Sequence, residues 1–111
     1  MKKIYEPLRR FLQLMGSNSF LVTDIDKANV DILLTMLGEV DKAILSAAFG
    51  LFGASPETRD ALAKRYGVNP EAIDEIIDKD LRKIAITPEW QMMEQQFSPL
   101  VRSRIGLVAT R

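Results

Sequence analysis

The sequence predicts an all-α protein: a small helical bundle containing a helix-turn-helix, with extra N- and C-terminal helices. Two observations favour this fold class. Apolar residues recur every three or four positions along most of the chain, which is the period of an amphipathic helix, and no stretch alternates convincingly as a strand does. A hydroxyl or amide side chain followed by Pro-Glu, a helix-start signal, occurs at residues 55–57, 69–71 and 87–89. We therefore divide the chain into an N-terminal amphipathic helix with a connector (1–25), a central domain (26–86) and a C-terminal helical extension (87–111).

The first predicted helix covers residues 4–15, and Gly16-Ser17-Asn18 is expected to end it. Its apolar face consists of Ile4, Leu8, Phe11, Leu12 and Met15. Arginines 9 and 10 lie on the opposite face, as in helices that bind membranes or partners. We favour the simpler interpretation that this helix folds across the main bundle.

The next two helices are separated by Gly38. The first starts from a cap at Asp26 or Asn29 and runs to Leu37; the second spans residues 39–49 and ends at Gly50. The apolar face of the second helix consists of Val40, Ala43, Ile44, Ala47 and Ala48.

Residues 55–84 predict two helices joined by a glycine turn, the layout of a helix-turn-helix. Ser55 is expected to cap a helix over 56–66 that carries Ala61, and Gly67 to end it in a left-handed conformation. Asn69 caps the second helix, over 70–84. The residues expected to be buried around the turn are Leu62, Val68, Ile73, Ile77 and Leu81.

The third start signal predicts a helix over 88–97, and Ser98-Pro99 predicts a further turn toward Arg104. Met92 and Met93 are expected to fill the core or an interface rather than to bind a metal.

The composition limits the possible function classes. Lys and Arg total 15, as do Asp and Glu, so no global charge favours nucleic acid. The chain has no cysteine and no histidine, which removes thiol chemistry and the commonest general base and metal ligand. A calcium loop starting at Asp24 would need glycine at its sixth position and glutamate at its twelfth, where Asn29 and Thr35 stand. We expect a protein that is not an enzyme and has no cofactor or metal.

The hydropathy and charge pattern indicates where in the cell the protein is expected. The apolar runs are too short to span a bilayer, and charges interrupt the first ten residues where a signal peptide would be apolar. We therefore expect a cytoplasmic protein that does not engage a membrane. Both termini are basic, through Lys2, Lys3 and Arg111 among others, whereas residues 24–60 are mainly acidic.

Three motifs in order resemble region four of bacterial RNA polymerase sigma factors. These are Ala48-Phe49-Gly50-Leu51, the helix-turn-helix from Thr58 to Val68, and the closing Lys79-Asp80-Leu81-Arg82-Lys83-Ile84. The resemblance covers residues 30–84, about half of the chain. It implies a recognition helix that enters the major groove of promoter DNA and a domain that docks on RNA polymerase.

The resemblance also implies which residues meet the partner. The DNA- or partner-binding residues fall on the predicted recognition helix: Pro70, Glu71, Ala72, Asp74, Glu75, Asp78, Lys79, Arg82 and Lys83. The family has arginines and a glutamine at several of these positions, whereas this chain has four acidic residues, at 71, 74, 75 and 78. Since DNA carries a negative charge about every 1.7 Å, such a stripe predicts repulsion.

Two hypotheses remain. In the first, the protein is associated with transcription and its sigma-like helix-turn-helix acts at RNA polymerase or promoter DNA. In the second, the same fold is a protein–protein interaction module that binds RNA polymerase or another transcription protein and does not read DNA. In either, binding of duplex DNA is expected to be weak, and the sequence does not indicate an oligomeric state.

Overall fold

The computed structural model describes residues 4–107, and this part of the chain is all helical, with no strand. Lys2, Lys3 and Arg111, which contribute to the predicted basic termini, lie outside these residues. The elements are α1 (Glu6–Ser17), the 3-10 helix η1 (Ser19–Leu21), α2 (Asp24–Thr35), α3 (Glu39–Phe49), α4 (Arg59–Tyr66), α5 (Pro70–Ala85), α6 (Pro88–Gln96) and α7 (Pro99–Arg104). The predicted fold class, a small all-α bundle, is confirmed for residues 4–107.

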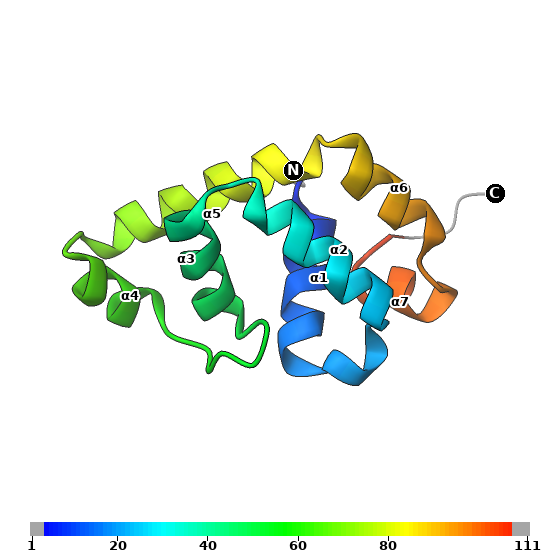
Figure 1. The fold of residues 1–111 in the computed structure, drawn as a ribbon, viewed down its shortest axis with the longest axis horizontal. Coiled ribbons are helices and arrows are strands. Elements are labelled where there is room, and N and C mark those ends of the chain that lie inside the picture. Colours follow the sequence, from blue (N-terminus) through cyan, green and yellow to red (C-terminus); the bar gives the residue numbers. More distant parts are fainter. Residues whose placement is uncertain (1–3, 108–111) are drawn as a thin grey trace.

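The helices form an elongated bundle with extents of 47 × 31 × 22 Å. Figure 1 shows α5 as the long helix that connects the end formed by α3 and α4 to the end formed by α6 and α7, with α1 and α2 between them. Figure 1 also places the start of α1 near the C-terminal end of α5. The division of the chain at residues 25/26 and 86/87 stays a prediction.

An aromatic cluster joins the N-terminal helix to the C-terminal extension. The ring centroid of Phe11 on α1 lies 4.6 Å from that of Phe97 and 5.6 Å from that of Trp90, and the last two are 5.7 Å apart. All three side chains are buried, so α1 contributes to the central core as the favoured interpretation of residues 4–15 expected.

Local capping explains most of the helix boundaries. The side chains of Asn69, Thr87 and Ser98 each accept a hydrogen bond from the backbone N–H three residues later, at the starts of α5, α6 and α7. Gly50 and Gly67 end α3 and α4 as expected, with φ angles of 67° and 69°. The left-handed conformation predicted for Gly67 is therefore confirmed, and Gly50 shares it. The predicted helices over 39–49, 70–84 and 88–97 therefore agree with the structure to within one residue.

The helix predicted over residues 56–66 was expected to start at residue 56. This start is wrong, because α4 begins at Arg59. The backbone N–H of Glu57 donates to the carbonyl oxygen of Ala47 on α3, at 2.8 Å, which holds this segment out of the helix. Thr58 then supplies the cap in place of Ser55, since its hydroxyl oxygen accepts from the N–H of Ala61 at 3.1 Å.

The bounds of α1 and α2 also differ from the prediction, and α2 ends at Thr35 instead of Leu37. Helix α2 starts from Thr23, whose hydroxyl oxygen accepts from the N–H of Asp26, so neither Asp26 nor Asn29 is the cap. The helix α1 starts at Glu6 instead of residue 4 and ends at Ser17, within the predicted Gly16-Ser17-Asn18, and Gly16 itself lies inside the helix against the backbone of Phe49. A Cβ at Gly16 would lie 1.8 Å from the carbonyl oxygen of Phe49, so only glycine lets α1 approach α3 this closely.

Of the residues predicted to be buried around the turn, Leu62, Ile73, Ile77 and Leu81 are buried, whereas Val68 is 41% exposed. Val68 lies in the turn, beyond the helix faces that pack together. The apolar periodicity also assigned four other residues to buried faces, and these are exposed: Ile4, Val40, Ala43 and Ala61. Ile4 precedes α1, Val40 and Ala61 lie in the first turns of α3 and α4, and Ala43 lies at the edge of the buried face of α3.

Candidate functional site

Helix α5, with the turn that precedes it, carries the residues that the sigma resemblance assigns to a partner. The turn consists of residues 67–69, and the two helices that it joins, α4 and α5, pack against each other. That these two helices cross at the angle of a helix-turn-helix stays a prediction. The core-facing side of α5 carries Ile73, Ile77, Leu81 and Ile84, all buried, so the opposite side is presented outward.

None of the nine predicted partner-binding residues is fully buried. Glu71, Glu75, Lys79, Arg82 and Lys83 are exposed, whereas Pro70, Ala72, Asp74 and Asp78 are partly covered. The fold therefore brings all nine to the outer surface of one helix, as expected of residues that follow one another at helical spacing.

Two of the four acidic residues are bound within the protein. The carboxylate of Asp74 accepts a hydrogen bond from the guanidinium group of Arg59 at the start of α4. One turn further along α5, the carboxylate of Asp78 accepts from Arg9 of α1, at 2.8 Å. The acidic stripe thus includes two ion pairs that tie α4 and α1 to α5. Both pairs are partly exposed to solvent, so each contributes little to stability.

The remaining charges divide α5 into two halves. Glu71 and Glu75 are exposed in the N-terminal half and form no ion pair within residues 4–107. Lys79, Arg82 and Lys83 are exposed in the C-terminal half. This order stabilises the helix, because acidic groups near its first turn and basic groups near its last turn complement the helix dipole.

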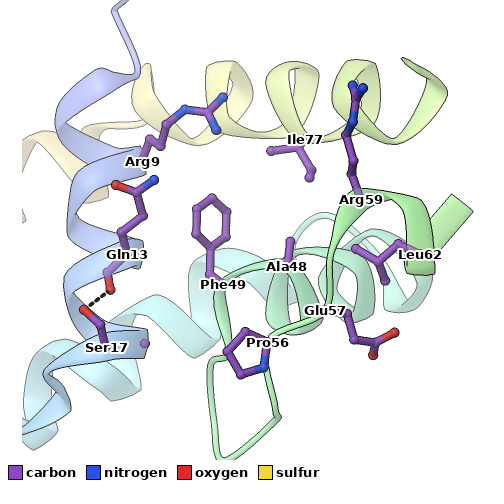
Figure 2. Close-up of a pocket in the computed structure, with 11 residues that line it drawn as sticks. Arg9, Gln13, Ser17, Ala48, Phe49, Pro56, Glu57, Arg59, Leu62 and Ile77 are labelled. Carbon is purple, nitrogen blue, oxygen red and sulfur yellow. Dashed lines mark hydrogen bonds between the residues drawn. The ribbon is translucent and has the colours of Figure 1, made fainter. Parts of the chain in front are cut away.

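A cavity of about 460 Å³ is lined in part by Arg9 and Arg59, the arginines of the two ion pairs (Figure 2). Arg9 from α1 and Arg59 from α4 extend toward α5 on either side of Ile77, and Phe49 and Leu62 supply apolar walls. Its lining comes from segments far apart in the chain, so no sequence motif indicated it. Because both guanidinium groups already bind aspartates, the cavity offers no free cation from these arginines to an anionic ligand.

The sequence analysis also missed a carboxyl pair between α3 and α5, formed by the buried Asp80 and the partly exposed Asp41. Asp80 is fully buried, and no N–H or hydroxyl group of residues 4–107 donates to its carboxylate oxygens, which instead face the carboxyl group of Asp41. Burial, together with the facing carboxyl group of Asp41 on α3, raises the pKa of Asp80 from 3.8 to about 7. A signal existed, since Asp80 interrupts the apolar spacing between Ile77 and Ile84.

No group of three or more metal-ligating side chains that could hold an ion occurs among residues 4–107. In the same residues, no helix is long and apolar enough to cross a membrane. Comparisons with known proteins found no matching family model, no similar curated protein and no similar solved structure.

Proposed function

We propose that this chain is a protein-interaction module of the transcription apparatus that binds RNA polymerase or another transcription protein and does not read DNA. It acts without catalysis and in the cytoplasm. The proposal combines the resemblance of residues 30–84 to sigma region four with the surface of α5.

One observation carries the choice of protein over DNA. The N-terminal half of a recognition helix is the part that reaches base edges in the major groove. In α5 this half exposes Glu71 and Glu75, while Asp74 holds Arg59 against the helix. A DNA duplex would therefore meet uncompensated negative charge where it needs cations, whereas a protein surface with basic residues would meet complementary charge.

Promoter binding is the second candidate, and the exposed basic side chains of Lys79, Arg82 and Lys83 favour it. These three residues lie toward the end of α5, where they can contact phosphates. Such contacts position a protein on DNA but carry no sequence information.

The two candidates are separated by paired binding measurements. Fluorescence anisotropy with labelled duplex DNA is expected to show weak or undetectable binding at physiological salt. Biolayer interferometry with purified RNA polymerase is expected to show saturable binding. Nanomolar DNA binding by the wild-type chain would replace this proposal with promoter reading, and absence of polymerase binding would leave only another transcription protein as partner.

Charge reversal tests the physical reason. Because Asp74 is paired with Arg59, the informative substitutions are Glu71→Arg with Glu75→Arg, which leave that ion pair in place. This double variant is expected to gain DNA affinity and a steeper salt dependence, by about one unit of log–log slope per new phosphate contact. The matched control, Glu39→Arg with Glu89→Arg, makes the same change in net charge on α3 and α6, and an equal gain there would show that position on α5 is irrelevant.

A further inference from the structure

Helix α2 presents an exposed apolar stripe. Ile25, Ile32 and Met36 are 75%, 62% and 59% exposed. With Asn29 they are spaced by four, three and four residues, the alternation of d and a positions in a heptad. All four side chains lie within roughly 60° of arc on one helix face. The stripe therefore has the pattern of a helix that packs against another helix, yet it faces outward.

Helix α6 lies beside α2 and adds an exposed methionine to this apolar surface. Met92 is 60% exposed, and it lines a cavity of about 220 Å³ together with Ile32 and Asn29. The buried side chains of Leu33 and Met93 also line it. We refer to Ile25, Asn29, Ile32, Met36 and Met92 as the α2–α6 seam. Contiguous apolar surface of this kind marks interaction sites in soluble proteins, and methionine adapts readily to a partner's shape.

The charges beside the seam are predominantly negative. Asp24 and Asp31 lie along one side of α2, and Glu89 lines the cavity on the α6 side. Asp31 is paired with Lys42, whereas Asp24 and Glu89 form no ion pair within residues 4–107. A second copy docked antiparallel would place this acidic side against its own equivalent, so the charge favours a basic partner.

We propose that the α2–α6 seam binds an amphipathic helix of another protein that carries lysine or arginine beside its apolar stripe. The inference rests on the proposed function as an interaction module and gives that module a binding surface separate from α5. A helix-in-groove complex of this type is recognised through apolar anchors at i, i+3, i+4 and i+7.

The test uses the full chain and two synthetic peptides of three heptads each. Both peptides have leucine at a and d, and they differ only at e and g, which are all lysine in one and all glutamate in the other. Fluorescence anisotropy at low salt is expected to give at least about tenfold tighter binding of the lysine peptide, a ratio that shrinks as salt is added. Asp24→Lys with Glu89→Lys is expected to reverse the preference.

Ile32→Asp is expected to weaken binding of the lysine peptide by more than about tenfold, since it places a charge in the apolar seam. Met92→Asp serves if that variant does not fold, as judged by circular dichroism. The matched control is Phe20→Asp in η1, a side chain that is 81% exposed and outside the seam, and it should leave the affinity unchanged.

Equal affinity for the two peptides, or full binding by both seam variants, would overturn the proposal. So would light scattering that shows a wild-type dimer and an Ile32→Asp monomer, because the seam would then be occupied by a second copy. If the seam variants lose the peptide but still bind RNA polymerase, this inference stands as a separate surface and the proposed function stands with it. If polymerase binding is absent while the peptide discriminates, only the polymerase assignment fails.

Discussion

The buried carboxyl group of Asp80 is expected to make the protein less stable as pH rises from 3.8 to about 7, and Asp80→Asn is expected to remove this dependence. Below pH 3.8 the carboxyl is protonated in both the folded and the unfolded chain. Between that value and about 7 the unfolded chain loses the proton while the folded chain keeps it. The free energy of unfolding therefore decreases across this window, and the decrease is complete once pH exceeds the folded-state pKa.

The size of the effect follows from the two pKa values. Each pH unit between them contributes about 1.36 kcal/mol, which sums to at most about 4 kcal/mol near pH 7. The facing Asp41 carboxyl shares in the titration, and Lys79 and Lys83 oppose the shift, so the measured value should lie below this limit. An asparagine amide at position 80 stays neutral and has N–H groups to donate to Asp41.

The assay is thermal unfolding followed by circular dichroism at a series of pH values from about 4 to about 8.5. At pH 4 the wild type and Asp80→Asn should unfold at similar temperatures. At pH 8 the variant should be more stable by about 1–4 kcal/mol, a Tm difference of roughly 5 °C for each kcal/mol. Asp78→Asn is the matched control, because it removes a carboxylate from the same helix that is ion-paired with Arg9 and partly exposed.

Two results would refute the reasoning. One is a difference between wild type and Asp80→Asn that does not change with pH, which would mean that Asp80 ionises normally in the folded protein. The other is a variant less stable than the wild type at pH 8, which would mean that the carboxylate of Asp80 is stabilised by donors that residues 4–107 do not show.

Four substitutions test the backbone arrangement by thermal unfolding. Gly16→Ala is expected to destabilise the protein by about 3 kcal/mol, because its Cβ would meet the backbone of Phe49, although alanine is favoured over glycine in an open helix; a gain in stability would contradict the close approach. Gly67→Val should cost about 1–2 kcal/mol, from its left-handed φ of 69° alone, since nothing lies within 4 Å of a Cβ there; an unchanged Tm would exclude this conformation. Thr58→Ala should cost about 1 kcal/mol through loss of the α4 cap, whereas Ser55→Ala should be nearly neutral; the reverse order would restore a helix start at residue 56.

The sequence alone determined the helices whose ends are built from neighbouring residues. Asn69 and Thr87 cap through hydrogen bonds to N–H groups three residues away, and Gly50 and Gly67 end helices through their own backbone freedom. Such signals need no knowledge of the rest of the fold. They also put the predicted partner-binding residues on one outward helix face, because helical spacing is local.

The tertiary structure decided everything that depends on residues distant in the chain. The start of α4 moved from Ser55 to Thr58 because Glu57 bonds to Ala47, and Gly16 stayed helical because α1 meets α3 there. The carboxylate of Asp78 in the acidic stripe is paired within the protein only because the fold brings Arg9, 69 residues away in sequence, next to it. Local capping energies are the same in any fold, whereas the pairing of a charge and the burial of Asp80 exist only once the helices are packed together.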